Sequence, residues 1–297
     1  MTTAVLLMAY GSPRSLDEVA PYLRDIRGGK PIRPGLLEDL TERYRMIGGS
    51  SPLLEMTRAQ AAAVASALGP GFHVAVGMKH WHPYIAEAIE TLPADVDRLI
   101  GVALAPHYSS ISIGGYEARV REVLITARPG LAFSMVDSWY GEPAFIELVA
   151  RNVRDALDGW DPGTTRVFFT AHSLPERIVA AGDPYLDQLL GSAKLVADAA
   201  GVPDHAFAFQ SSSVTGEPWL GPDILEALTA YAEQGGTRAV ICPVGFVADH
   251  LEILYDIDIE AAAHAEKVGL ALRRTRSPNA DPLLADAIEQ VVRSVSP

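Results

Sequence analysis

Residues Val167–Pro175 read VFFTAHSLP, and the same order of residue types occurs earlier, in VLLMAYGSP at Val5–Pro13. In each copy a mainly apolar run ends in Ala, a ring side chain follows (His172 or Tyr10), and two further residues lead to Pro. Such a run, bounded by turn residues, is typical of a buried strand. Pro limits continuation of the strand, so each ring is expected at a strand end. This repeated pattern predicts that the chain has two similar halves. The alternative is that the two segments are unrelated buried strands.

Short apolar runs alternate with amphipathic helical patterns over the whole chain, which is typical of α/β folds with parallel sheets. We expect strands at 5–9, 72–78, 98–105, 132–136, 166–170, 205–209 and 239–243. Helices are expected at 15–27, 36–46, 57–68, 85–91, 116–126, 144–157, 185–200, 223–234 and 282–294. The predicted fold class is therefore α/β, with two Rossmann-like domains at 1–141 and 142–297. Each would be a parallel sheet flanked by helices, with the active-site cleft between them, and the last helix could pack back on the first domain.

Composition narrows the possible partners and location. At 297 residues with 48% hydrophobic content, the chain can bury a large core. Its net charge of −13 argues against nucleic acid and anionic membranes, which are bound through basic patches. No apolar run reaches about 18 residues and no signal-peptide pattern is present, so we expect no transmembrane segment and a cytoplasmic location. Cys242 is the single cysteine, which excludes a [2Fe–2S] cluster ligated within this chain.

Four carboxylates follow the predicted strand at 239–243: Asp249, Glu252, Asp256 and Glu260, at spacings of three, four and four. At about 100° per residue they would share one face of a helix. Like charges at this spacing weaken a helix, so the row favours a path for a cation; a solvated acidic face is the alternative. Asp258 falls on the opposite, apolar side, which indicates that the helix is bulged or ends nearby.

His172 is the ring side chain best suited to chemistry. Imidazole transfers protons near neutral pH and binds divalent first-row metals, and the residues alone leave both roles open beside a structural one. A single His with a row of carboxylates suits transient handling of a divalent metal better than a permanent cage. The motifs GxGxxG, Walker A, HExxH and GxSxG are all missing, so nucleotide binding, a zincin site and a nucleophile elbow are unsupported.

The segment RYRMIGGSSP (Arg43–Pro52) places guanidinium, phenol and hydroxyl groups beside Gly48 and Gly49. These groups can hold carboxylates, with Arg pairing in a bidentate manner and Gly allowing close backbone approach. A glycine helix cap followed by a loop is the alternative.

These segments together resemble the ferrochelatase family, nearly end to end. The resemblance is carried by MAYGSP (Met8–Pro13), RYRMIGGSSPL (Arg43–Leu53), GMKH (Gly77–His80), APHYSS (Ala105–Ser110), TAHSLPERI (Thr170–Ile178), GDPYLDQL (Gly182–Leu189), FQSSSVTGEPWLGPDI (Phe209–Ile224) and PVGFVADHLEILYDID (Pro243–Asp258). The closest similarity is to the soluble, monomeric enzymes of Gram-positive bacteria that use coproporphyrin III. Departures are Arg27-Gly28-Gly29-Lys30 in place of a basic pair, Phe209 in place of Trp, and a changed Ser211–Val214 segment.

The resemblance implies an enzyme that inserts Fe²⁺ into coproporphyrin III to give coproheme in haem biosynthesis. His172 would be the active-site histidine and Glu252 its carboxylate partner, with Asp256 and Glu260 continuing the metal path outward. Tyr10 would be an axial ligand to the metal on the opposite porphyrin face. Asp249 would be structural, as a helix N-cap. Residues implied in substrate binding are Tyr10, Arg27, Arg43, Tyr44, Ser51 and Tyr116. Lys79 and His80 match a loop pair of open role.

Porphyrin and Fe²⁺ are thus the expected partners, with a possible transient hand-off to the next haem-pathway enzyme. Since Fe²⁺ is a substrate, no cofactor is required, and a monomer is expected. The alternatives are a protoporphyrin IX ferrochelatase, a cobalt or sirohydrochlorin chelatase of the same fold, and a non-catalytic porphyrin or haem carrier.

Overall fold

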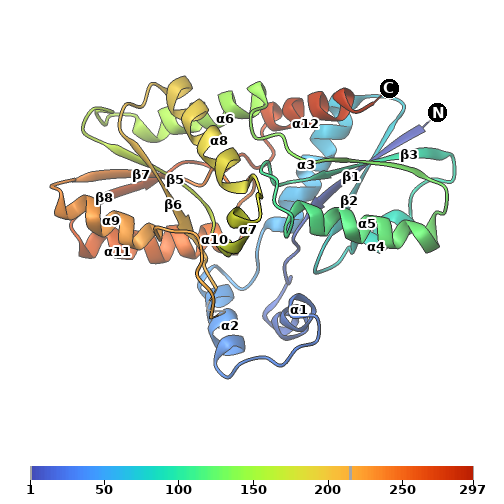
Figure 1. Ribbon diagram of the computed structural model, residues 1–297, viewed down its shortest axis with the longest axis horizontal. Helices are drawn as coiled ribbons and strands as arrows, with labels where there is room; N and C mark the ends of the chain where they lie inside the picture. Colours follow the sequence, from blue (N-terminus) through green and yellow to red (C-terminus); the bar gives the residue numbers. More distant parts are fainter. Residues whose placement is uncertain (1, 214–215, 297) are drawn as a thin grey trace.

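The computed structural model describes residues 2–213 and 216–296, and within them the strands form two four-stranded parallel sheets. The first sheet has the order β2-β1-β3-β4, with β1 (Thr2–Ala9), β2 (Phe72–Met78), β3 (Val96–Ala103) and β4 (Ala132–Val136). The second has the order β6-β5-β7-β8, with β5 (Arg166–His172), β6 (His205–Gln210), β7 (Arg238–Cys242) and β8 (Ala271–Arg274). Helices flank both sheets (Figure 1), so the predicted α/β class is confirmed.

The two similar segments, Val5–Pro13 and Val167–Pro175, take equivalent places in the two sheets. Strand β1 pairs with β2 and β3, and β5 pairs with β6 and β7, so each is an interior strand of its sheet. Their apolar residues are fully buried, as interior strands of a covered parallel sheet require. His172 ends β5 and Tyr10 directly follows β1, so both rings lie at the carboxyl end of an interior strand.

Strand β8 (Ala271–Arg274) was not predicted from the sequence. It has only four residues, ALRR, and two of them are arginines. Its place is fixed by pairing with β7, where Arg238 to Ile241 lie opposite Ala271 to Arg274. A short edge strand with charged side chains carries no apolar pattern, so only its pairing identifies it.

The helices of the first half are α1 (Val19–Ile26), α2 (Leu36–Met46), α3 (Leu53–Leu68), α4 (Ile85–Glu90) and α5 (Ile113–Ala127), with a 3₁₀ turn η1 (Leu16–Glu18) before α1. Those of the second half are α6 (Pro143–Leu157), α7 (Arg177–Ala180), α8 (Tyr185–Ala200), α9 (Ile224–Glu233), α10 (Leu251–Leu254), the π-helix η2 (Asp256–Ala261), α11 (Ala262–Lys267) and α12 (Pro282–Ser294). No helix of the described residues is long and apolar enough to cross a membrane.

One apolar core draws on both halves of the chain. Val5 of β1 and Phe169 of β5 belong to the same buried cluster, together with residues from α3, α6 and α12. Helix α12, at the C-terminus, packs against α3 of the first half as well as α6 (Figure 1). The division into domains at 141/142 stays a prediction.

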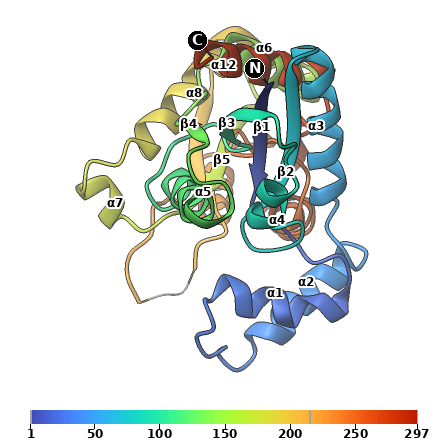
Figure 2. The same ribbon diagram turned by 90° about the vertical axis from the view of Figure 1, so that its right-hand side faces the viewer.

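Helices α1 and α2 project below the two sheets (Figures 1 and 2). Two side-chain contacts tie this part to the loop after β2. The Trp81 indole donates to Glu18 at 2.8 Å, and His80 Nδ1 lies 2.9 Å from the Asp25 carboxylate. A third contact runs from the Tyr22 hydroxyl to the carbonyl of Gly11, at 2.9 Å. The segment beside Tyr10 is therefore held in place by α1.

Candidate active site

The imidazole of His172 is oriented by the backbone carbonyl of the next residue, Ser173. Its Nδ1 lies within hydrogen-bonding distance of the Ser173 carbonyl, and the Tyr185 hydroxyl donates to the His172 carbonyl at 2.9 Å. A carbonyl only accepts, so Nδ1 must carry a hydrogen, and Nε2 of the neutral ring holds the free lone pair. That lone pair is available to take a proton or a metal ion.

Glu252, on α10, faces His172 although eighty residues separate them in the sequence. Its Oε1 lies 3.9 Å from His172 Nε2, and both side chains are about one-third exposed. A first-row cation bound at about 2.1 Å to each of N and O spans at most roughly 4.2 Å, so one ion could touch both atoms. The pair therefore suits either a shared metal or a proton passed through water.

The backbone of Glu252 is anchored to the second sheet. Its carbonyl accepts from Gln210 Nε2 at 2.9 Å, and Gln210 Oε1 accepts from the Thr170 hydroxyl at 2.9 Å. Thr170 and Gln210 belong to the neighbouring strands β5 and β6. The chain of hydrogen bonds thus connects α10 with the two strands that end beside the site.

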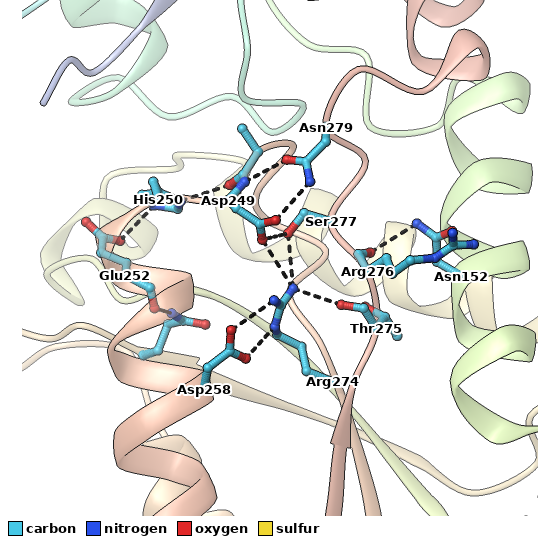
Figure 3. Close-up of polar contacts among 12 residues, drawn as sticks. Asn152, Asp249, His250, Glu252, Asp258, Arg274, Thr275, Arg276, Ser277 and Asn279 are labelled. Atoms are coloured by element: carbon cyan, nitrogen blue, oxygen red, sulfur yellow. Dashed lines mark hydrogen bonds and ion pairs between the residues drawn. The ribbon is translucent and has the colours of Figure 1, made fainter. Parts of the chain in front are cut away.

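His250 is a site residue that the sequence reasoning did not single out. Its Nε2 lies 3.9 Å from Oε2 of Glu252, and its Nδ1 lies 2.9 Å from the Ala248 carbonyl (Figure 3). Burial raises the pKa of Glu252, but attraction to His172 and His250 in their protonated forms outweighs burial and lowers this pKa to about 2. Burial lowers the pKa of His250, and Glu252 and the Ala248 carbonyl more than offset this, so that pKa is raised. Glu252 is therefore an anion between two imidazoles.

The sequence predicted that the helix carrying the four carboxylates is bulged or ends near Asp258, and the π-helix η2 confirms this prediction. Helix α10 ends at Leu254 and η2 begins at Asp256. The Tyr255 carbonyl accepts from the amides of both Ile259, at 3.2 Å, and Glu260, at 2.9 Å, so the ladder changes to i→i+5 bonds. The single regular helical face predicted for the four carboxylates is therefore wrong. Asp256 is buried and Glu260 is exposed.

Asp256 connects the second half with α2 of the first. Its carboxylate accepts from Arg43 Nη1 at 3.3 Å and from the Ser211 hydroxyl. Arg43 also lies over the Tyr255 ring, 4.7 Å from its centroid. Burial and the charge of Glu252 raise the pKa of Asp256 to about 6, although Ser211 and Arg43 act in the opposite direction.

Asp249 does not belong to the row at all. Its carboxylate accepts from the Ser277 hydroxyl at 2.7 Å and from Asn279 Nδ2 at 2.8 Å, on the loop after β8 (Figure 3). The N-cap of α10 is His250, so the predicted N-cap role of Asp249 is wrong. Because its oxygens hold the loop, Asp249 has a structural place in the fold.

Tyr10 and the GMKH segment lie together in the first half. The exposed Tyr10 ring is tilted against His80, with ring centroids 4.6 Å apart. Although the residue as a whole is 43% exposed, partial removal of the phenol from water and the charge of Glu252 both raise the pKa of Tyr10, so Glu252 acts on a residue of the first half. Lys79 Nζ lies 5.1 Å from the ring centroid of the buried Tyr116.

The other residues implied in substrate binding sit in different settings. Arg27 donates to the Pro31 carbonyl at 3.0 Å, and the Ser51 hydroxyl accepts from the Leu53 amide at 3.2 Å. Tyr44 is buried. Of the predicted residues, the structure joins Arg43 to Asp256 and His172 to Glu252. Within residues 2–213 and 216–296, no three His, Cys, Asp or Glu side chains gather closely enough to hold a metal ion.

The two glycines after α2 act as a helix terminus. Gly48 and Gly49 have φ of 100° and 94°, values that L side chains rarely adopt. The Gly49 amide donates to the Tyr44 carbonyl at 2.8 Å, a bond of the kind that closes a helix end. The cap interpretation is therefore confirmed for Gly48 and Gly49, while Arg43 in the preceding turn reaches Asp256.

Comparison with known proteins settles the family. A protein-family sequence model described as ferrochelatase matches residues 2–296. The chain belongs to the ferrochelatase family. It is 45% identical over 299 residues to a ferrochelatase of Herpetosiphon aurantiacus, covering 98% of each chain. It is 41% identical over 297 residues to a coproporphyrin III ferrochelatase of Halalkalibacterium halodurans, covering 97% of this chain and 96% of the relative. Like these relatives, it is an enzyme of the metal-chelating class.

Solved structures agree in fold. CbiX, named as the terminal enzyme of sirohaem biosynthesis in denitrifying bacteria, superposes with a TM-score of 0.59 at 14% identity, covering all of both chains. SirB from Bacillus subtilis gives a TM-score of 0.61 at 14% identity, covering 99% of this chain and 95% of that one. At this identity the likeness concerns the fold alone.

Two departures from the ferrochelatase pattern can be located. Phe209 is buried, with its ring centroid 5.2 Å from that of Phe207, so it is a core residue. In the changed segment, Ser211 contacts Asp256, while Val214 lies outside the described residues.

Proposed function

We propose that this chain inserts Fe²⁺ into coproporphyrin III, giving coproheme in haem biosynthesis. The observation that carries the proposal is the 3.9 Å approach of His172 Nε2 to Glu252 Oε1, with the buried Asp256 close enough to interact with Glu252. Relatives named coproporphyrin III ferrochelatases support the choice of porphyrin.

The reaction exchanges two pyrrole protons for one Fe²⁺, so the site must accept protons and deliver a stripped metal. The free lone pair on His172 Nε2 takes the two pyrrole protons one after the other and releases each to water, and the neighbouring Glu252 anion stabilises the imidazolium that forms each time. In the alternative role the lone pair contacts the metal, and both protons leave directly to water. His250 lies beside the second carboxylate oxygen of Glu252, where its positive charge when protonated helps keep Glu252 ionised. The pair thus accepts positive charge next to the ring nitrogens.

The metal approaches along Glu260 and Asp256 in this proposal. Carboxylate oxygens are hard ligands that exchange stepwise for the water of a divalent ion. Glu260 is exposed and Asp256 buried, which gives the order from solvent to Glu252. Tyr10, from the first half, would ligate the metal on the opposite porphyrin face.

Propionate groups would be held by the α1–α2 region and its surroundings, through Arg27, Arg43, Tyr44, Ser51 and Tyr116. Arginine pairs with carboxylates in a bidentate manner, which suits propionates. Coproporphyrin carries four propionates and protoporphyrin two, so a site with several propionate-binding groups favours coproporphyrin. We further propose that the enzyme works as a cytoplasmic monomer without a cofactor, with a transient hand-off of coproheme to the next haem-pathway enzyme.

The decisive experiment compares kcat/KM for coproporphyrin III and protoporphyrin IX under anaerobic Fe²⁺, followed by absorbance. We expect at least about a tenfold preference for coproporphyrin, since the extra propionates make charge-assisted hydrogen bonds. A preference for protoporphyrin would overturn the porphyrin assignment. Turnover only with Co²⁺ and sirohydrochlorin would indicate the other chelatase. Porphyrin binding without metal insertion would indicate a carrier.

A further inference from the structure

Arg274, the last residue of β8, holds two carboxylates that flank α10. Its Nε and Nη2 donate to Oδ1 and Oδ2 of Asp258 at 2.6 and 2.9 Å, a bidentate fork. Its Nη1 lies 3.3 Å from Oδ1 of Asp249. The side chain is 18% exposed, so the guanidinium is largely shielded from water. Figure 3 shows Asp258 and Arg274 on the opposite side of α10 from the Glu252 carboxylate.

The two acids bracket the part of the chain that carries the proposed chemistry. Asp249 precedes α10, and Asp258 lies inside the π-helix. Between them stand His250, Glu252 and Asp256, none of which contacts Arg274 in the hydrogen bonds of the described residues. Arg274 therefore fixes both ends of a segment whose central side chains point elsewhere.

This segment needs an external restraint. A π-turn is a less favourable arrangement than a continuous α-helix, and the neighbouring negative charges of Glu252, Asp256 and Glu260 repel one another. The guanidinium holds the back of the segment through its bonds to Asp258 and Asp249, without entering the site. Asn279 adds a second anchor, because its Oδ1 accepts from the Asp249 amide at 2.9 Å.

Holding these ends determines where the site side chains face. The Asp249 anchor places the next residue, His250, whose ring stands 3.9 Å from Glu252. The Asp258 fork holds the π-turn that places Asp256 toward Arg43 and Ser211. If the turn relaxed into a regular helix, the residues after Tyr255 would rotate relative to Glu252.

We propose that Arg274 is a positioning residue for metal insertion, which sets the relative orientation of Glu252 and Asp256 by holding Asp258 and Asp249 together. This rests on the proposed function. Arg274 contacts Asp258 and Asp249 on the side of α10 opposite the Glu252 carboxylate, so its removal is expected to slow the chemical step while leaving porphyrin binding intact.

The test uses Arg274→Gln and Arg274→Lys, with Arg276→Gln as the matched control. Arg276 lies two residues on, pairs with the single carboxylate of Asp155 at 2.5 Å, and is 72% exposed. Porphyrin fluorescence quenching gives the Kd and the fraction of functional sites, and anaerobic Fe²⁺ insertion gives kcat per functional site. Normalising to functional sites removes the effect of unfolded protein.

We expect Arg274→Gln to lower kcat per site by roughly ten- to a hundredfold, since a misplacement near 1 Å costs that much, with porphyrin Kd changed less than about threefold. Arg274→Lys should rescue little, because an ammonium cannot make the fork to Asp258 while reaching Asp249. Arg276→Gln should match the wild type. Unchanged kcat per site in Arg274→Gln, with only a lower melting temperature, would show that Arg274 merely stabilises the fold.

A second variant keeps the proposal testable if Arg274→Gln does not fold. Asp258→Asn removes one charge of the fork, and we expect a smaller loss of kcat in the same direction. The double variant should lose no more than Arg274→Gln alone, because both changes break one interaction. Multiplying losses would contradict a shared role. If the wild type itself inserted no metal, the proposed function would fail instead, before Arg274 was tested.

Discussion

His172 Nε2 faces Glu252 Oε1 across 3.9 Å, from the end of β5 to the first turn of α10. That distance is too long for a direct hydrogen bond, so a proton or metal ion has room between the two groups. Attraction to His172 and His250 outweighs burial and holds the pKa of Glu252 at about 2, so this carboxyl group is ionised at neutral pH. The geometry therefore fits a site that accepts a cation or a proton in its resting state.

Both His172 and Glu252 are expected to be needed for metal insertion. His172→Ala removes the lone pair, and Glu252→Gln removes the charge while preserving shape. Loss of a proton-transfer group typically costs 10²–10⁴-fold, so we expect at least about a hundredfold lower kcat for each. Porphyrin affinity, measured by fluorescence quenching, should change little. Near wild-type insertion by both variants would refute their assigned roles.

The buried charge of Asp256 is expected to lower the stability of the fold while supporting metal insertion. Its folded pKa of about 6 exceeds the usual 3.8, so the folded state disfavours the ionised form. Above pH 6 the buried charge costs stability, at most about 3 kcal/mol, and the cost disappears as the pH falls from 6 toward 3.8. Asp256→Asn is therefore expected to raise the melting temperature at pH 7.5 and to lower the rate of metal insertion.

At pH 4.5 the stability gained by Asp256→Asn should shrink, because wild-type Asp256 is then largely protonated. Glu266→Gln, at an exposed position on α11, is a matched control with little effect at either pH. A gain for Asp256→Asn that stayed constant between pH 7.5 and 4.5 would contradict the raised pKa.

Arg43 should affect the pH dependence of activity. Its charge lowers the pKa of Asp256, so Arg43→Met is expected to raise that pKa and move the acidic limb of kcat/KM for the metal to higher pH. If Arg43 also holds a propionate, KM for the porphyrin should rise roughly tenfold. Arg45→Met serves as control, because Arg45 is exposed and pairs with Glu42. An unmoved acidic limb would argue against the coupling.

Gly245 makes room for the strand end that carries His172. A Cβ at Gly245 would lie 2.5 Å from the Cβ of Ala171 and 2.9 Å from its Cα. Gly245→Ala is therefore expected to cost about 1–3 kcal/mol and to lower activity by shifting His172. Adding Ala171→Gly should restore part of both, as measured by denaturant unfolding and metal insertion. Gly141→Ala, where the nearest atom is 3.8 Å away, should be well tolerated.

Much of the fold follows from local patterns in the sequence. The runs at Val5–Pro13 and Val167–Pro175 are strongly apolar and end in turn residues, so strand, turn and exposed ring can all be predicted from them. Strand β8 could not be predicted, because Ala271–Arg274 has no apolar pattern. This segment forms a strand only through its pairing with β7. A bulge near Asp258 was predictable, since this acid falls on the apolar side of any regular helix.

The sequence by itself determined the α/β class, the place of His172 at a strand end, the family motifs and the identity of the acids between 249 and 260. Only the tertiary structure decided which partners each of those acids contacts. Asp249 and Asp258 contact Arg274, Glu252 faces His172 and His250, and Asp256 contacts Arg43. The physical reason is that a carboxylate's role depends on the partners that distant segments bring to it, which spacing along one helix does not encode.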